Sequence, residues 1–225
     1  MIRKRKSVRK YDMTKLDEAT LNKIREKIGA LVPLFPEIRY SIEMTDSTKG
    51  LFNIKAPHYL VFGSEQAEGF AENIGFIGQQ LDLFFSEIGL GACWLGAAKP
   101  QGEVNSALPF VICMSFGRPA EELHRNLADF RRKPLHEMSE GQDPRLEAAR
   151  LAPSGINAQN WYFIAEGGKI HCYRKKAVLG FINKMGFIDL GIAIWHIASE
   201  SENFAYTKEV NAPEKKGYIY MGTVK

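Results

Sequence analysis

One short segment of the sequence is crowded with polar side chains and lies between two apolar patterns. Residues 152–161 read Ala-Pro-Ser-Gly-Ile-Asn-Ala-Gln-Asn-Trp. Pro153 keeps the residue before it out of helical geometry, and Gly155 permits backbone angles that other residues avoid. Hydroxyl and amide groups in a tight turn suit recognition of a flat polar ligand, and these groups belong to Ser154, Asn157 and Gln159. The same composition also describes a plain polar loop between a helix and a strand.

A second segment with possible chemistry is the basic N-terminus. Residues 2–10 carry six cationic side chains, and Ser7 lies among them. The planar fork of arginine grips a phosphate group in two places, so the segment could be an anion site. It could equally be a solvated arm or a nucleic-acid patch. We expect no nucleic-acid partner, because interleaved aromatic residues and recognised binding modules are absent.

Together these two segments resemble motifs of the nitroreductase family of flavoproteins. Residues 152–161 are similar to the APSxxNxQPW signature, with Asn160 at the usual proline. The run Arg5-Lys6-Ser7-Val8-Arg9-Lys10-Tyr11 resembles the RRSxRxF/Y opening, and residues 89–96 resemble the GLGxxWxG segment. Residues 131–134 stand where the family has a basic RKP element.

The resemblance implies an FMN cofactor and assigns residues to it. The residues implied at FMN are Arg5, Lys6, Ser7, Arg9, Trp94, Leu95, Gly96, Arg131, Arg132, Pro153, Ser154, Gly155, Asn157 and Gln159. The basic motif would hold the phosphate and ribityl chain, and backbone N–H groups of residues 95–97 would face the flavin N5 and O4 edge. Asn157 would bind the pyrimidine edge, with residues 153–155 behind the ring. Arg132, or failing it Arg131, would reach the phosphate, unless this run is a solvated loop.

The function implied is an FMN-dependent oxidoreductase of the nitroreductase type. NADH or NADPH would reduce the flavin, and a nitroaromatic, a quinone or a similar small molecule would accept the electrons. No residue is expected to be catalytic with certainty, although Arg9 would stabilise charge on the reduced ring. The sequence shows no acid–base, P-loop or metal motif, as expected where a cofactor carries the chemistry. Alternatives are dehalogenation, flavin breakdown, or a flavin-storing or sensing module without turnover.

The elements that must position these segments follow from periodicity. Apolar residues at helical spacing predict helices over 16–31 and 68–88, with Asp17 or Thr14 as the first N-cap. A third helix is expected from Gly186 to Ala198, and a short one before Pro153. Strands are expected at 38–44, 58–62, 110–117, 161–164 and 217–221. The small residues Gly75 and Gly78 more often serve helix packing than a ligand.

An internal repeat explains why the two family motifs are so far apart. The strand at 58–62 and the helix at 68–88 match the strand at 161–164 and the helix from Gly186, with a late strand after each. We therefore expect two degenerate copies, residues 1–138 and 139–225. The resemblance implies an α+β fold with three α/β/α layers. It also implies a pseudo-dimer within one chain that binds a single flavin, as a monomer or a weak homodimer.

Composition limits the compartment. The chain has 225 residues, with 45% hydrophobic and 25% charged residues, as in soluble globular proteins. No apolar run reaches about 20 residues, so we expect no membrane span. The three widely spaced cysteines predict buried free thiols in a reducing compartment, and therefore a cytoplasmic protein without a metal site.

Overall fold

The computed structural model describes residues 1–102, 104, 106–176 and 180–225. Its contacts divide the chain into two units, and each is described by itself. Unit 1 comprises Met1 with residues 3–70 and 77–129, and unit 2 comprises Ile2 with residues 71–76 and 130–225. The division falls between Asp129 and Phe130, whereas the boundary after residue 138 that the repeat suggested stays a prediction.

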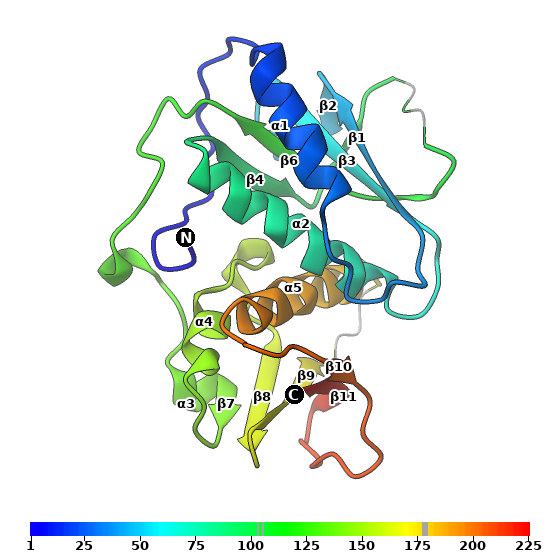
Figure 1. The fold of residues 1–225 in the computed structure, drawn as a ribbon, viewed down its shortest axis with the longest axis vertical. Coiled ribbons are helices and arrows are strands. Elements are labelled where there is room, and N and C mark those ends of the chain that lie inside the picture. Colours follow the sequence, from blue (N-terminus) through cyan, green and yellow to red (C-terminus); the bar gives the residue numbers. More distant parts are fainter. Residues whose placement is uncertain (103, 105, 177–179) are drawn as a thin grey trace. The chain divides into compact units, whose positions relative to one another are not determined.

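Unit 1 is built on a four-stranded antiparallel sheet in the order β1-β3-β6-β4 (Figure 1). Its strands are β1 (Tyr40–Thr45), β3 (His58–Ser64), β4 (Gly91–Leu95) and β6 (Phe110–Gly117). A separate ribbon pairs β2 (Thr48–Gly50) with β5 (Ala98–Pro100), and η1 (Leu127–Asp129) ends the unit. Every residue of β3 is buried, which is expected for a central strand covered on both faces.

Two helices accompany this sheet. In α1 (Glu18–Gly29), the Asp17 side chain accepts a hydrogen bond of 2.8 Å from the Thr20 N–H, which confirms Asp17 as the N-cap. Most of α2 (Phe70–Glu87) packs on the sheet, where Phe85 stacks on Phe116 of β6 with ring centroids 4.8 Å apart. A side chain on Gly78 would collide with the Trp94 ring, so this glycine serves packing as predicted.

Unit 2 contains a five-stranded sheet in the order β10-β11-β9-β8-β7. Its strands are β7 (Ser139–Glu140), β8 (Trp161–Glu166), β9 (Lys169–Lys175), β10 (Tyr206–Thr207) and β11 (Tyr218–Val224). Only the short pairing of β7 with β8 is parallel among the described strands. The helical elements are α3 (Leu135–Met138), α4 (Arg145–Leu151), η2 (Gly155–Asn157) and α5 (Gly180–Ala198). Figure 1 shows α5 lying across one face of this sheet.

The two units repeat one topology. Unit 1 runs α1-β1-β3-α2-β4-β6, and unit 2 runs α4-β8-β9-α5-β10-β11. In both, the sheet places the first strand beside the second, then the fourth, then the third, and all of these pairs are antiparallel. The two units therefore share a strand order, whereas a pseudo-dimer of two degenerate copies stays a prediction.

The sequence matched the wrong strands within this repeat. The strand at 161–164 corresponds to β1, and β9, which was not predicted, corresponds to β3. Gly167 and Gly168, at φ 57° and 76°, form the two-residue hairpin between β8 and β9 that should have signalled the missing strand. The prediction that the last helix starts at Gly186 was also wrong, because α5 starts at Gly180.

Further predictions concern the membrane and the cysteines. None of the helices in the described ranges combines the length and apolar character that crossing a bilayer requires. Cys93, Cys113 and Cys172 are free and buried, which confirms the predicted state of the thiols.

Candidate functional site

In unit 1 the basic N-terminal segment runs beside the glycine-rich strand β4. Ser7 forms a parallel bridge with Ala92, and the Val8 N–H donates to the Ala92 carbonyl at 3.0 Å. Val8 packs directly over Gly91, where any side chain would collide with it. The structure thus brings together two of the motifs that the sequence assigned to one cofactor.

Arg5 lies inside this arrangement, with only 1% of its surface exposed. Its Nε is 2.8 Å from Oδ2 of Asp82 on α2, and its Nη2 donates to the Ser7 hydroxyl at 2.5 Å. Its Nη1 is buried and lacks a hydrogen-bond partner among the described residues. Arg5 therefore fixes the Ser7 side chain and keeps one donor unused.

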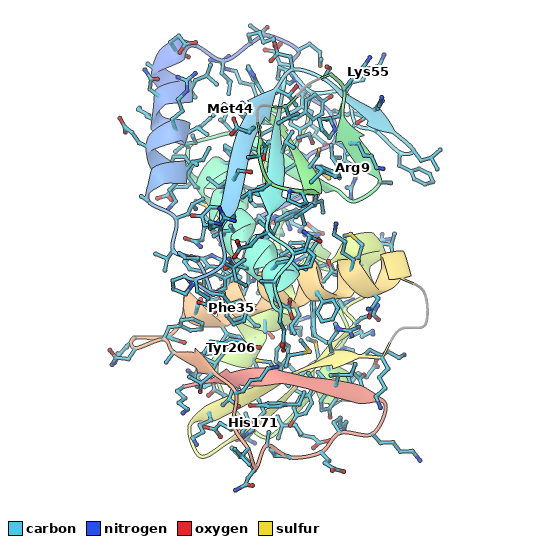
Figure 2. All side chains as sticks on the ribbon, turned by 90° about the vertical axis from the view of Figure 1, so that its right-hand side faces the viewer. Arg9, Phe35, Met44, Lys55, His171 and Tyr206 are labelled. Atoms are coloured by element: carbon cyan, nitrogen blue, oxygen red, sulfur yellow. The ribbon has the colours of Figure 1, made fainter. Side chains whose placement is uncertain are left out.

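Two more guanidinium groups gather around this pair. Arg9 is exposed at the β4 edge of the unit, away from Met44 on β1 (Figure 2), and its Nη1 lies 3.5 Å from the Ser7 carbonyl oxygen. The Nε of Arg125 donates to the Arg5 carbonyl at 3.0 Å. Burial, together with Arg5 and Arg9, lowers the pKa of Arg125 to about 10. The three guanidinium groups repel one another, as the lowered pKa of Arg125 shows. A bound anion would therefore stabilise the cluster.

Sequence reasoning missed Arg125 because no family motif was matched to it. The sequence offered one signal, a basic residue next to His124 in the segment that follows β6. In the structure His124 forms a β-bridge with Arg5. Lys6, which the family motif assigns to the phosphate, contacts the segment after β6. Its Nζ pairs with Glu121 at 3.2 Å and donates to the Glu122 carbonyl at 2.9 Å.

The end of β4 presents backbone rather than side chains. Trp94 is packed over Gly78, stacks on Phe62 at 5.6 Å, and donates from Nε1 to Gln79 at 3.4 Å. Leu95 is buried, Gly96 is half-buried and Ala97 is exposed. Polar backbone groups therefore become accessible at Gly96, directly after the strand.

In unit 2 the polar turn has an unusual backbone. Ile156, Asn157 and Gln159 have φ values of 48°, 59° and 48°. Such left-handed geometry is rare for these residue types, and for a β-branched residue it is a true outlier. Gly155, expected to supply the special geometry, is not among the residues with positive φ. Ser154 closes the turn, because its Oγ accepts the Gln159 N–H at 3.0 Å.

The basic segment 131–133 lies against this turn within unit 2. Arg132 donates to Oδ1 of Asn157 at 2.5 Å, and Asn157 donates to the Arg131 carbonyl at 2.7 Å. The Lys133 N–H donates to Oε1 of Gln159 at 2.8 Å. The amides of Asn157 and Gln159 thus hold neighbouring protein segments. The Arg131 side chain is exposed, Pro153 is buried, and the Ile156 side chain is fully exposed.

Comparisons with known proteins agree with these motifs. The family model described as "Putative TM nitroreductase" matches residues 1–201. A comparison with curated proteins found no match. The chain is similar to the crystal structure of a putative nitroreductase from Thermotoga maritima MSB8, with a TM-score of 0.67 and 21% identity over 99% of this chain and 89% of that one.

Two further solved structures resemble part of the chain. An FMN-dependent nitroreductase from Clostridium difficile R20291 has a TM-score of 0.45 and 19% identity, covering 58% of this chain and 92% of that one. A nitroreductase family protein from Clostridium novyi NT has a TM-score of 0.43 and 17% identity, covering 54% and 87%. The family model spans most of the sequence, and the chain therefore belongs to the family described as "Putative TM nitroreductase".

Proposed function

We propose that the chain binds one FMN and acts as an NAD(P)H oxidoreductase of the nitroreductase type, passing electrons to nitroaromatics, quinones or similar acceptors. The observation that carries this proposal is the cationic cluster of unit 1, formed by Arg5, Ser7, Arg9 and Arg125 beside β4. Arg5 and Arg125 are 120 positions apart, and they meet because the segment after β6 pairs with the N-terminal segment, as the Arg5–His124 bridge shows.

The cluster fits the phosphate of FMN on three counts. The buried Nη1 of Arg5 has no hydrogen-bond partner among the described residues. The lowered pKa of Arg125 reflects burial and two nearby guanidinium groups. The Ser7 hydroxyl, oriented by Arg5, can rotate to donate to a phosphate oxygen. Charge-assisted hydrogen bonds to phosphate would relieve the repulsion among the arginines.

The same site offers a place for the flavin ring. Backbone N–H groups at Gly96 and Ala97 follow β4 without a bulky side chain at Gly96. When bound, FMN would accept and donate hydride, which is the chemistry that the protein lacks by itself. If FMN is bound there, Arg9 would supply positive charge near the ring, and the backbone of residues 95–97 would orient the ring.

We further propose that the polar turn of unit 2, residues 153–159, contributes to FMN binding, as the family motif implies. Within unit 2, the Ser154 Oγ accepts the Gln159 N–H, and Arg132 donates to Oδ1 of Asn157. These hydrogen bonds hold the polar groups of the turn in one conformation, with a guanidinium group beside them.

The visible spectrum of the purified chain tests the function. We expect a yellow protein with one FMN per chain that bleaches when NADH or NADPH is added without oxygen and regains colour with menadione or nitrofurazone. A protein that binds no added FMN would refute the proposal. Bound FMN that neither nucleotide reduces would instead favour a storage or sensing module.

A further inference from the structure

Asp189 of α5 carries a carboxyl group buried directly beneath the polar turn of unit 2. Only 3% of the Asp189 surface is exposed. Oδ1 accepts a hydrogen bond of 2.9 Å from the Gly155 N–H, which links the turn to the helix. Both carboxyl oxygens lie within 4 Å of where a side chain of Gly155 would begin. Asp189 makes no other hydrogen bond or ion pair with the residues that the structure describes.

The turn needs such an anchor because its backbone is strained. Ile156, Asn157 and Gln159 all have positive φ, and residues in this geometry persist only where their surroundings hold them. Ile156 contributes no buried packing, since its side chain is fully exposed. Hydrogen bonds therefore hold the turn: Ser154 spans it to Gln159, residues 131–133 bind the amides of Asn157 and Gln159, and Asp189 holds its start at Gly155.

We propose that Asp189 is the positioning residue of this turn, and that its ionised carboxylate holds residues 155–159 in the conformation that binds FMN. This role rests on the FMN binding proposed above. A charged acceptor forms a hydrogen bond about twice as strong as a neutral one, so protonation of Asp189 weakens the link to Gly155. The turn then loses part of what opposes its strain, and the binding-competent fraction falls.

The titration of Asp189 falls in the range where this matters. Burial raises its pKa to about 7, and the Gly155 N–H opposes that rise. The other acidic, basic and histidine side chains on α5 and on elements packed against it are Glu72, Arg145, Glu147, Arg150, Glu166, Lys169, His171, Arg174, Lys175, Lys184 and His196. Arg145 and Arg150 pair with Asp143 and Glu147, and Arg174 stacks on Phe187. Burial and the Gly155 bond, not these charges, set the pKa of Asp189.

The sign of the linkage makes the proposal testable. An unfolded aspartate titrates near pH 4. Because the folded chain holds the proton up to about pH 7, the contribution of Asp189 to stability is full below about pH 4 and falls as the pH rises to 7. The ionised state that anchors the turn is thus the less favourable state for folding. Asp189→Asn, which keeps an acceptor and loses the charge, should raise the melting temperature at pH 8.

The first experiment follows the Gly155 amide by NMR in the full chain without FMN, from pH 5.5 to 8.5. We expect its proton shift to titrate with a midpoint near 7 in the wild type. In Asp189→Asn the titration should vanish, whereas it should persist in Glu202→Gln, which removes an exposed acid of the same unit. A Gly155 shift that does not titrate in the wild type, or that titrates equally in Asp189→Asn, would overturn the proposal.

The second experiment measures the FMN dissociation constant at pH 6 and pH 8. If only the ionised form is competent, affinity should be about tenfold weaker at pH 6. The FMN phosphate also titrates near pH 6 and adds its own pH dependence to the dissociation constant. The ratio measured for Asp189→Asn gives the size of this contribution. Equal pH ratios in both proteins would overturn the role of Asp189. Failure of the wild type to bind FMN at every pH would instead overturn the proposed function, and the Gly155 titration would decide the anchor alone.

Discussion

The two units share a strand order but treat the outer face of the sheet differently. In unit 1 the face away from α2 is covered by the N-terminal segment, whose Val8 and Tyr11 pack with Tyr59, Val61 and Cys113. In unit 2 the face away from α5, where His171 lies (Figure 2), carries the tyrosines 162, 173, 218 and 220. A loop between β10 and β11 covers this face. The Tyr173 hydroxyl donates to the Pro213 carbonyl, and the Lys215 ammonium group lies over the Tyr162 ring.

The difference shows where a repeated framework can diverge. The third strand is five residues long in unit 1 (β4) and two in unit 2 (β10). The strained polar turn precedes the first strand only in unit 2, since the corresponding Leu31–Arg39 segment of unit 1 has no positive φ. The two units thus agree in strand order and differ in the segments outside the sheets. Four changes would break or sharpen this comparison.

The largest effect is expected where the framework of unit 2 is most crowded. Gly191→Ala places a Cβ 2.0 Å from the Glu72 carbonyl oxygen, which is fixed backbone. Overpacking of this kind costs about 3 kcal/mol. Urea unfolding should show the loss, and Gly29→Ala, where nothing lies within 4 Å, should change stability little. Unchanged stability of Gly191→Ala would mean that the close helix crossing does not persist in solution.

The next effect concerns the cluster that only unit 1 possesses. Arg125→Gln should weaken FMN binding about 10- to 100-fold, because a hydrogen bond to a charged group contributes about 1.5–3 kcal/mol. Riboflavin, which lacks the phosphate, should bind the wild type and Arg125→Gln with equal affinity in fluorescence titrations. Arg39→Gln, an exposed arginine paired with Glu65, serves as the matched control. Equal losses for FMN and riboflavin would contradict a phosphate role.

A smaller effect distinguishes the buried titratable groups of the two units. His58 in unit 1 accepts the Leu16 N–H at Nε2, and burial lowers its pKa. The unfolded chain therefore binds the proton more readily, and this contribution to stability is lost as the pH falls below about 6.5, opposite in sign to that of Asp189. Denaturation at pH 7.5 and 5.5 should show a smaller pH dependence in His58→Gln. A pH dependence equal to that of the wild type would exclude His58 as its source.

The smallest effect compares the helices that precede the first long strand of each unit, α1 and α4. Asp17 caps α1, whereas the N-cap of α4, Pro144, makes no side-chain cap hydrogen bond. Asp17→Ala should lower stability slightly, because the Thr20 N–H loses its acceptor, and Asp17→Asn, which keeps an acceptor, should lower it less. Equal losses for the two variants in urea unfolding would show that the charge, including its pairing with Arg118, matters more than the cap.

Sequence reasoning located most elements because their apolar periodicity was strong. The strand at 110–117 and the long helix at 70–87 are where the pattern placed them. It failed at β9, in which His171 and Arg174 are buried polar residues that interrupt the apolar alternation. There the Gly-Gly turn was a better signal than composition.

The family motifs single out Arg5, Ser7 and the polar turn as candidate FMN-binding residues, and this assignment stays a prediction. The motifs could not show that Arg5 is buried against Asp82 or that Lys6 pairs with Glu121. Arg125 and Asp189 were missed because each gains its meaning from a partner 34 to 120 residues away. Pairings of that range depend on the fold as a whole.

The three buried cysteine thiols can report local opening of the two units. Cys93 and Cys113 lie in one unit and Cys172 in the other, all inaccessible, and burial raises the pKa of Cys113 to about 12. A maleimide reagent can therefore react only when the surrounding strands open transiently. Mass spectrometry of the labelled peptides would measure the rate of local opening in each unit separately, with no introduced cysteine.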